Sequence, residues 1–511
     1  MIELTAALDA YLTDESRLSG GAAESVFLPE SEGEIADILR ENQSKGLPVT
    51  VSGARTGIVG GAVPRGGIVI ATERLDRIES SKLDAASGEW RVTLEPGVLL
   101  KTLQDLGCGA PANGAATSYF FPVDATETSA SLGGMAATNA SGALSHGYGA
   151  MRAFVRSLRA VLAGGESLAV RRGEYTAKAG ETLLVRTASG RKIAVPTPTY
   201  HTPAVKHTAG LHASSPFDAV DLFIGTEGTL GVITQLELAL APYPGTCFGG
   251  LAFFPSEAEA VKFVRIVRDE KPAGTETCRA AALEYYDAEA LLLADRAETR
   301  EQLGLPSLPQ AGAAVYFEQF CGEEESEALA EAWSIALDLS GSSLDHVWSA
   351  LDEKERHKLK ALRHLVPEEV NRAVENNRRL CPAIYKVGTD LAVPHAYLAE
   401  MVAAYRAGLA REEIPGVIFG HIGDNNLHVN MLPRDEKMLR RAKALHLEWA
   451  AKAVGMGGTV AAEHGIGKTK DYLMPIMYDA GALAEMHAVK KALDPRGILS
   501  PGNGGLIPRA G

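Results

Sequence analysis

The chain has 511 residues, of which 46% are hydrophobic and 22% charged, an ordinary globular composition. At about 100–200 residues per domain, this length predicts two to four domains with a substantial core. Its 64 acidic and 50 basic side chains give a net charge of −14. Because binding to a nucleic-acid backbone needs clustered Lys and Arg, we expect no nucleic-acid partner, whereas a small anionic substrate remains compatible with one or two local cations.

The five cysteines are widely spaced and include no Cys-x-x-Cys pair. A disulfide framework and a cysteine-ligated metal cluster are therefore not expected. The N-terminal segment lacks the basic start and apolar stretch of a signal peptide, and no uncharged run of 18 or more apolar residues occurs. We expect a soluble, cytoplasmic protein without a transmembrane segment, in contact with a membrane at most peripherally.

In chain order, a helix is predicted to begin after Ser31, which has the capping-box spacing to Glu34, and to end at Gly46. Strands are predicted at 48–52 and after Gly67, and a strand enters a helix at Pro96–Gly97. This alternation of strands and helices predicts an α/β or α+β subdomain.

From residue 221 onwards the chain is organised differently. The segment 221–242 is predicted to hold an apolar strand, a glycine turn and an alternating strand, and 241–245 a linker. Charged helical sequence then dominates to about residue 410. Strand-like sequence returns at 416–432 and is followed by an amphipathic helix.

Glycine is concentrated in three runs, at 52–61, 126–149 and 221–242. A glycine-rich loop after a strand offers unobstructed backbone N–H groups to a pyrophosphate, although tight turns between strands need glycine as well. The G-x-G-x-x-G spacing of the Rossmann fold is missing. Three runs within about 200 residues favour one extended, phosphate-bearing cofactor that is contacted at several points.

A histidine and carboxylate cluster is predicted near the C-terminus. His421 follows an apolar strand, and His428 and Asn430 lie two residues apart on the next strand, so that they face the same side. Glu463 and His464 follow another apolar segment. Two imidazoles and a carboxylate from separate strand ends can hold a divalent cation with coordination positions left open, whereas single histidines are more often structural. The combination H-x-G-D-x-N-x-H and E-H-G in one chain favours the cation site.

The ordered motifs resemble a known flavoprotein family. PVTVSGARTGIVGGAVP, PVDATETSASLGGMAATNASG and DLFIGTEGTLGVIT resemble the FAD-binding domain of the vanillyl-alcohol oxidase/p-cresol methylhydroxylase flavoproteins. GHIGDNNLHVN, AAEHGIGKTK and ALDPRGILSPG extend the resemblance over nearly the whole chain. The nearest group is that of the D-lactate, glycolate and D-2-hydroxyglutarate dehydrogenases.

The resemblance implies an α+β fold in three parts. These are a two-subdomain FAD-binding domain of the p-cresol methylhydroxylase type over 1–245, an α+β substrate cap with an antiparallel sheet over 246–455, and a segment over 456–511 that packs back on the FAD-binding domain.

The resemblance also implies the residues that contact FAD. They are Gly53, Ala54, Arg55, Thr56, Gly57, Gly60 and Gly61 in the pyrophosphate loop, Asp124, Ser129, Gly133, Gly134, Asn139 and Gly142 in the second run, and Glu227, Gly228 and Ile233 in the third. The chain departs from the family pattern where Ser52-Gly53-Ala54-Arg55-Thr56 stands for Arg-Gly-Gly-Gly-Thr, and at Ser500, where Asn is usual. Arg55 then either contacts the pyrophosphate or points to solvent. Because the loop has no histidine, we expect FAD to be held non-covalently.

In the same way, the resemblance assigns His421, His428 and Glu463 as metal ligands, Asn430 as a substrate contact and His464 as the catalytic base. Zinc is the first choice of metal, with manganese and iron left open. Arg363 is expected to bind the substrate carboxylate, and Lys386 is a second candidate. Whether Lys386 binds a second carboxylate would distinguish a dicarboxylate from lactate.

The expected reaction is the FAD-dependent oxidation of a small anionic D-2-hydroxy acid to the 2-oxo acid, in which a base removes the hydroxyl proton as hydride passes to flavin N5. D-Lactate is the first choice, before D-2-hydroxyglutarate and glycolate. The acceptor is expected to be a separate quinone, cytochrome or electron-transferring flavoprotein, and a homodimer is a family-level expectation. Two alternatives are a flavin-free hydrolase or non-haem iron oxygenase that uses the His/His/Glu set, and a non-catalytic subunit of a larger oxidase complex.

Overall fold

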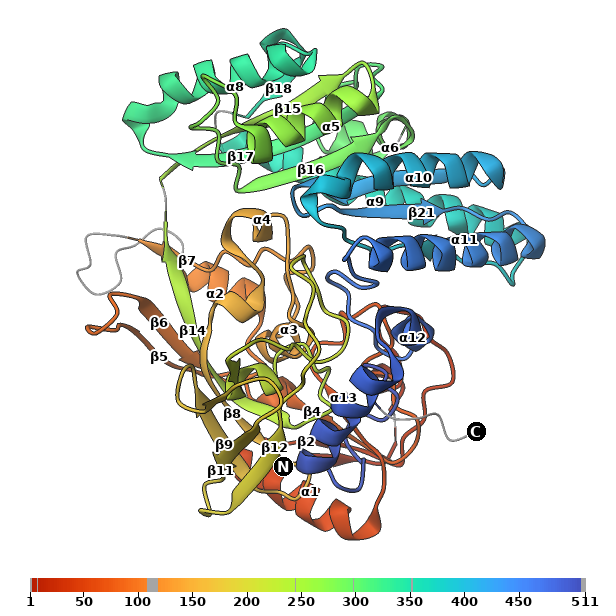
Figure 1. Cartoon of the computed structure of the whole chain (residues 1–511). Coiled ribbons are helices and arrows are strands. Elements are labelled where there is room, and N and C mark those ends of the chain that lie inside the picture. Colours follow the sequence, from red (N-terminus) through yellow and green to blue (C-terminus); the bar gives the residue numbers. More distant parts are fainter. Residues whose placement is uncertain are drawn as a thin grey trace.

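The computed structural model describes residues 2–6, 8–107, 118–243, 245–296, 298–350 and 353–506. Two regions stand one above the other, and the chain passes between them where β14 ends and β15 begins (Figure 1). Within the described ranges, no helix is both long and apolar enough to cross a lipid bilayer.

The first sheet has four strands in the order β1-β2-β4-β3, namely β1 (Ile2–Leu4), β2 (Ser25–Leu28), β4 (Ile68–Ala71) and β3 (Val49–Ser52). Strands β2 and β3 run parallel to β4, and α1 (Glu32–Lys45) connects them. The Ser31 side chain accepts the backbone N–H of Glu34, and Gly46 ends the helix with φ 69°. The predicted helix and its two ends are therefore confirmed.

The second sheet is antiparallel, with the order β5-β6-β14-β8-β9. Its strands are β5 (Ile78–Leu83), β6 (Trp90–Leu94), β14 (Val232–Pro242), β8 (Val155–Val161) and β9 (Ser167–Arg171), and β7 (Tyr119–Phe120) pairs with the end of β14. Two ribbons accompany it, β10 (Thr176–Ala177) with β13 (Phe217–Asp218) and β11 (Thr182–Arg186) with β12 (Lys192–Pro196). The helices here are α2 (Leu100–Gly107), α3 (Leu132–Thr138) and α4 (Ser145–Tyr148).

One predicted strand in this region is wrong. The apolar run after Asp221 was expected to be extended, but η5 (Ala219–Leu222) is a 3₁₀ turn. The Asp218 carboxylate accepts the N–H of Val220 and caps this turn. Local hydrogen bonding of an Asp side chain to the backbone thus prevailed over the strand preference of the apolar residues that follow.

The upper region is built on a seven-stranded antiparallel sheet in the order β18-β15-β17-β16-β20-β21-β19. The strands are β18 (Val347–Ser349), β15 (Thr246–Phe254), β17 (Ala313–Cys321), β16 (Ala282–Asp287), β20 (Gly416–His421), β21 (Asn426–Met431) and β19 (Val387–Gly388). The helices are α5 (Glu257–Arg265), α6 (Ala288–Asp295), α7 (Thr299–Gln302), α8 (Ser326–Ser340), α9 (Glu353–Leu380), α10 (Leu398–Arg411) and α11 (Glu436–Gly455). The antiparallel sheet with helices is the expected cap architecture.

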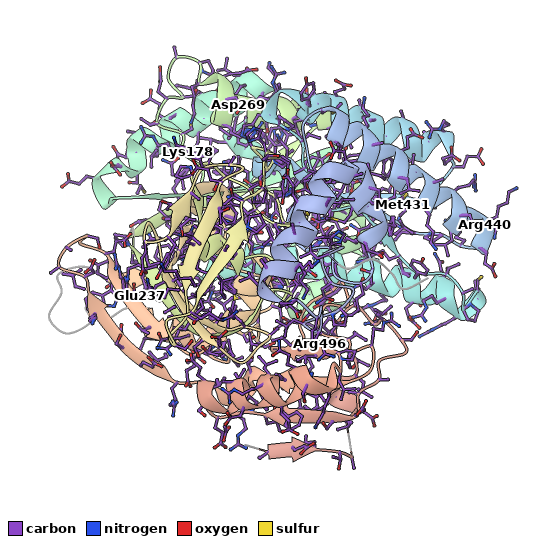
Figure 2. All side chains as sticks on the ribbon, turned by 60° about the horizontal axis from the view of Figure 1, so that its bottom comes forward. Lys178, Glu237, Asp269, Met431, Arg440 and Arg496 are labelled. Carbon is purple, nitrogen blue, oxygen red and sulfur yellow. The ribbon has the colours of Figure 1, made fainter. Side chains whose placement is uncertain are left out.

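After α11 the chain returns to the lower region, where α12 (Met474–Met477) and α13 (Ala480–Leu493) lie (Figure 1). The backbone N–H of Ser500 donates to the carbonyl of Val49 on β3, at 2.7 Å. Arg496, labelled in Figure 2, donates to the carbonyl of Gln43 in α1, at 2.5 Å. The described part of the segment thus packs on the N-terminal region, while the boundaries at 245 and 455 stay a prediction and residues 507–511 lie outside the described ranges.

Candidate active site

The candidate site lies where the β20–β21 hairpin meets the loop that follows α11. His421 is the last residue of β20, and His428 lies in the middle of β21, the antiparallel partner of β20. Glu463 and His464 come from the loop, which Asp390 holds by accepting the backbone N–H of Glu463 at 3.3 Å and that of His464 at 3.0 Å. Two pairs of side chains, from the hairpin and from the loop, are thereby brought together.

Three imidazoles contact the carboxylate of Glu463. Its Oε2 atom lies 3.1 Å from Nε2 of His421, and its Oε1 atom lies 2.9 Å from Nε2 of His428 and 3.3 Å from Nε2 of His464. The ring centroids of His428 and His464 are 5.0 Å apart and nearly parallel. The structure therefore brings together the predicted ligands and the predicted base.

The far nitrogen of each predicted histidine ligand has an acceptor. Nδ1 of His421 lies 2.6 Å from Oε1 of Glu284, and Nδ1 of His428 lies 3.1 Å from the carbonyl oxygen of Thr389. A carbonyl only accepts, so the Nδ1 atom of His428 donates to Thr389, and its Nε2 atom faces Glu463. This is the arrangement in which proteins hold histidine ligands of a divalent cation, and the donor set fits one.

The charge balance also suits a cation. Burial alone would lower the pKa of His421, but Glu284 and Glu463 outweigh it and raise that pKa to about 9. Burial would raise the pKa of Glu463, but His421 and Lys206 hold it well below its usual range. The carboxylates therefore favour positive charge on His421, and a divalent cation would also compensate their negative charge.

The ligand atoms of Asp390, His428, Glu463 and His464 lie within 4.8 Å of one another, which defines a second, overlapping donor set. It replaces His421 by Asp390 and includes the predicted base. Lys470 already binds Asp390, with Nζ 2.9 Å from Oδ2. Lys206 binds Glu463 in the same way, so lysine contacts do not decide between the two sets. We favour the predicted set because it leaves His464 free for proton transfer.

Sequence reasoning missed three buried charged residues of the site. Lys206 donates to Oε2 of Glu463 at 2.5 Å, Glu284 binds His421, and Asp390 holds the loop. Glu284 lies on the apolar strand β16, and Lys206 and Asp390 lie in short segments without a metal-site motif. A carboxylate between Leu283 and Tyr285 in a strand was the one signal that pointed to Glu284, because a buried charge needs a partner.

The predicted substrate residues differ in their distance from this cluster. Arg363 of α9 is 13% exposed, and its guanidinium lies 3.4 Å from Asp124 and 3.9 Å from Glu284. Asn430 is buried on the same side of β21 as His428. Lys386 is exposed and donates to Asn371 at 3.1 Å, and among the described residues it has no contact with the histidine cluster.

The first glycine run has the features of an anion-binding loop. None of the backbone N–H groups of residues 55–61 donates to an acceptor in the described part of the chain. This stretch includes Thr56 and Gly57. A Cβ atom on Gly57 would meet nothing within 4 Å, so the space beside Gly57 is open. A Cβ atom on Gly53 would lie 2.4 Å from Oγ of Ser131, whose hydroxyl accepts the N–H of Ala54 at 3.3 Å. This loop fits a pyrophosphate.

The Arg55 side chain does not extend freely from this loop but contacts two other residues. Its backbone is in the left-handed region with φ 62°. Its guanidinium lies 3.2 Å from the Glu73 carboxylate and 4.6 Å from the centre of the Tyr11 ring. Arg55 is thus paired with Glu73 and Tyr11, and its expected contact with the pyrophosphate stays a prediction.

The third glycine run joins the C-terminal segment. The buried Glu227 carboxylate accepts the backbone N–H groups of Ile466 and Gly467, both at 2.8 Å. Lys468 donates to the carbonyls of Gly60 and Gly61 in the first run, at 3.2 Å and 3.1 Å. The loop that carries Glu463 is thereby tied to the predicted cofactor loops.

The other predicted FAD residues lie around these loops. A Cβ atom on Gly133 would meet Pro96 at 2.4 Å, and one on Gly142 would meet the Asp124 backbone at 2.2 Å. Asn139 accepts the backbone N–H of Arg152, Gly134 donates its backbone N–H to Ser131, and Gly228 lies against Ser500. Two predicted contacts are engaged elsewhere: the exposed Ser129 binds Glu127, and Ile233 is buried in β14 opposite Ala160.

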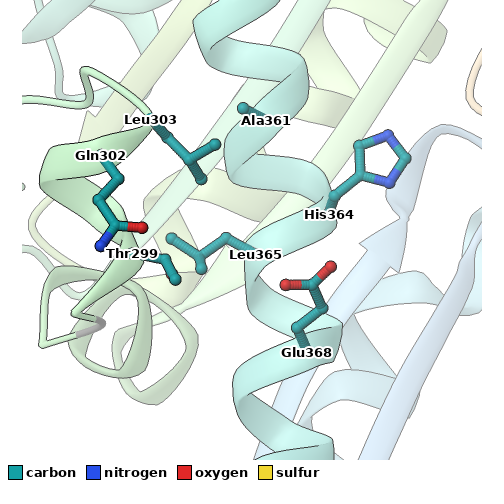
Figure 3. Close-up of a pocket in the computed structure, with 7 residues that line it drawn as sticks. All are labelled: Thr299, Gln302, Leu303, Ala361, His364, Leu365 and Glu368. Atoms are coloured by element: carbon teal, nitrogen blue, oxygen red, sulfur yellow. The ribbon is translucent and has the colours of Figure 1, made fainter.

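A separate cavity of about 330 Å³ lies between α9 and the segment 299–303 (Figure 3). His364 and Glu368, one turn apart on α9, line it together with Leu365. Neighbouring residues of a helix point about 100° apart. The cavity therefore lies beside another face of α9 than the one from which Arg363 reaches Glu284. The cavity is therefore distinct from the histidine cluster.

The chain matches two protein-family models and several known proteins. The family model "FAD binding domain" matches residues 23–171, and "FAD linked oxidases, C-terminal domain" matches residues 249–503. The chain is 30% identical over 483 residues to "Probable D-lactate dehydrogenase, mitochondrial" of Danio rerio, covering 93% of this chain and 83% of that protein. It is 29% identical over 501 residues to "D-2-hydroxyglutarate dehydrogenase, mitochondrial" of Bos taurus, covering 96% and 78%.

Among solved structures, p-cresol methylhydroxylase with substrate bound aligns with a TM-score of 0.65 at 11% identity, covering 99% of this chain and 94% of that one. At this identity the likeness concerns the fold alone. The expected α+β fold of the p-cresol methylhydroxylase type is thus confirmed.

Proposed function

The chain belongs to the FAD-dependent D-2-hydroxy acid dehydrogenases of the FAD-linked oxidase family, and from this premise we propose that it oxidises D-lactate to the 2-oxo acid. The observation that carries the proposal is the convergence of three imidazoles on Glu463, all within 3.3 Å of its carboxylate. A relative named for D-lactate supports this choice of substrate, and one named for D-2-hydroxyglutarate makes that acid the second candidate.

The side chains have distinct tasks in the proposed reaction. His421, His428 and Glu463 would hold a divalent cation, zinc first. The N–H groups of residues 55–61, which have no acceptor in the described part of the chain, would hold the pyrophosphate of FAD. When bound, the cation supplies Lewis acidity to the substrate hydroxyl, and FAD accepts hydride. Arg363 offers a guanidinium fork for the substrate carboxylate, and Asn430 a side-chain amide.

His464 is suited to take the hydroxyl proton at Nε2. Its Nδ1 atom lies 3.4 Å from Oδ2 of Asp390, which fixes the ring and leaves Nε2 on the side of Glu463. Asp390 also stabilises the imidazolium that forms when the proton is taken. The pair thus combines an oriented base with a counter-charge for its protonated form.

The test is anaerobic stopped-flow reduction of the FAD-loaded protein by D-lactate, D-2-hydroxyglutarate and glycolate, with L-lactate as the stereochemical control. We expect D-lactate to bleach the flavin fastest. A spectrum that all three acids leave unchanged would overturn the substrate class. A colourless, flavin-free protein would instead favour the hydrolase or oxygenase alternative.

Replacing the proposed base separates catalysis from structure. His464→Ala should lower the rate of flavin reduction by about 10²–10⁴-fold while FAD stays bound. His346→Ala, which alters an exposed histidine far along the chain, is the control and should reduce at the normal rate. Loss of FAD from the His464 variant would mean that this residue has a structural role.

The finer expectations on partners stay predictions. They are a separate electron acceptor, a homodimer and a cytoplasmic location. Flavin that is reduced by substrate in the isolated chain would also contradict the alternative of a non-catalytic subunit.

A further inference from the structure

Glu284 is a buried carboxylate that the proposed mechanism does not use. It lies on β16, between β17 and β20 in the cap sheet, and is 3% exposed. Its neighbours on the strand are apolar or aromatic. A carboxylate in such a place is costly to bury unless both of its oxygens have partners. The partners of Glu284 therefore indicate its role.

Each oxygen of Glu284 faces a different part of the candidate site. Oε1 lies 2.6 Å from Nδ1 of His421, and Oε2 lies 3.9 Å from Nε of Arg363. The pairing of β16 with β20 aligns Tyr285 with Gly420 and Tyr286 with Phe419, and the same register carried one residue further sets Glu284 opposite His421. The contact to His421 is therefore fixed by the backbone of the sheet.

The contact to Arg363 links two functions. Arg363 comes from α9, and its other contact is Asp124, whose backbone packs against Gly142 in the second glycine run. The guanidinium thus lies between one carboxylate of the cap and one of the lower region. Without Glu284, it would be held from one side only.

We propose that Glu284 is a positioning residue, which holds the His421 ring for the cation with one oxygen and anchors Arg363 for the substrate carboxylate with the other. The inference rests on the proposed function, since it concerns the same site. It goes beyond that function because it joins cation binding and substrate binding through one side chain.

The first test measures Zn²⁺ binding to the FAD-loaded protein after metal removal, by competition with a chromophoric chelator. Loss of a hydrogen-bonded partner behind a metal ligand typically costs about 10–100-fold in metal affinity. We expect this loss for Glu284→Gln. The matched control is Glu318→Gln on the neighbouring strand β17, a carboxylate that is also 3% exposed but binds Tyr316 instead of the site, and its Zn²⁺ affinity should be unchanged.

The second test measures D-lactate oxidation by the same variants at saturating Zn²⁺. Because metal is then no longer limiting, the kcat of Glu284→Gln should recover in large part, while KM stays raised several-fold owing to the loosened Arg363. A merely structural carboxylate would not separate KM from kcat in this way. Glu284→Asp keeps the charge but moves it away from both partners, so it should also bind Zn²⁺ more weakly than wild type, and it serves if the Gln variant does not fold.

The outcomes distinguish this inference from the proposed function. If wild type binds Zn²⁺ and Glu284→Gln binds it equally well, the positioning role of Glu284 is overturned while the proposed function stands. A normal KM at saturating Zn²⁺ would overturn the anchoring of Arg363. If wild type binds no Zn²⁺, the proposed cation site fails and the inference falls with it.

Discussion

Single residues in the candidate site are paired by opposite charge. Lys206 neutralises Glu463, Lys470 neutralises Asp390, and His421 and Arg363 share Glu284. Removing one member of such a buried pair leaves an uncompensated charge, which commonly costs about 3–5 kcal/mol. This cost is a large part of the free energy of unfolding of a typical domain. Variants of this site therefore need a folding control beside every activity measurement.

Arg55 makes a prediction at the residue scale. A non-glycine residue at φ 62° is strained by roughly 1–2 kcal/mol, and a partly exposed ion pair such as the one with Glu73 returns about 0–1 kcal/mol. Arg55→Gly should therefore unfold at the same temperature as wild type or slightly higher. Because the guanidinium is engaged with Glu73 and Tyr11, FAD affinity, measured by flavin fluorescence, should stay within a few-fold of wild type.

The control is Arg55→Leu, which keeps the backbone strain but loses the ion pair and the contact with Tyr11. It should be the less stable of the two variants. A loss of FAD affinity of more than tenfold in Arg55→Gly would contradict the prediction, since it would mean that the guanidinium leaves Glu73 to bind the cofactor.

Residues that belong to a motif could be predicted from the sequence, whereas their partners could not. His421, His428, Glu463 and His464 were found because turn and strand sequence surrounds them in a specific spacing. Glu284 contacts His421 from 137 positions away in the chain, and Lys206 contacts Glu463 from 257 positions away, separations that no local pattern encodes. The orientation of Arg55 also depended on two such distant partners.

At the scale of elements, Asp287 joins a strand, a helix and an arginine at the end of β16. Its carboxylate accepts the backbone N–H of Ala290 at 2.7 Å, which caps α6, and that of Ile418 in β20 at 2.9 Å. It also accepts from Arg406 at 2.7 Å, and it is fully buried. Removing it leaves several buried donors unpaired.

Asp287→Ala should therefore lower the free energy of unfolding by about 3–5 kcal/mol, seen as a markedly lower melting temperature in calorimetry. Asp479→Ala removes an exposed N-cap, that of α13, and should cost only about 1 kcal/mol. Equal effects of the two substitutions would contradict the view that the buried contacts of Asp287, rather than its cap alone, stabilise the cap sheet.

Elements with strong local signals could be predicted well. The helix α1 was predicted because Ser31 and Gly46 mark both ends, and α11 because its apolar residues recur with helical spacing. The 3₁₀ turn at 219–222 could not be predicted, since its apolar sequence is typical of a strand and only the Asp218 cap favours the turn. Short apolar runs are ambiguous in this way because packing, rather than period, selects their conformation.

At the scale of the whole molecule, the site depends on the chain's return after α11. Glu227 and Lys468 tie the loop of Glu463 to the predicted cofactor loops, and Lys490 donates to the carbonyl of Thr229. His421 and His428 come from the cap, and Glu463 and His464 come from the segment that packs below it. This juxtaposition followed only from the family resemblance, because periodicity describes elements and not their assembly.

One histidine of α11 is buried and His207, which precedes β13, is half-buried, and we expect them to make the folded protein sensitive to acid. Burial lowers the pKa of His446 in α11 to about 4 and that of His207 to about 3. An unfolded histidine titrates near 6.5, so the unfolded chain binds protons more readily. The stability that neutral histidines provide is complete above about pH 6.5 and declines as the pH falls towards 4.

His446 isolates this effect, because it is 4% exposed and its Nε2 atom has no hydrogen-bond partner in the described structure. His446→Leu should keep or raise the melting temperature at pH 7.5, and its melting temperature should fall less steeply between pH 6.5 and 4.5 than that of wild type. The difference amounts to at most about 3 kcal/mol at pH 4. His346→Leu, at an exposed site, should follow the wild-type curve, and parallel curves for wild type and His446→Leu would show that His446 titrates normally in the folded protein.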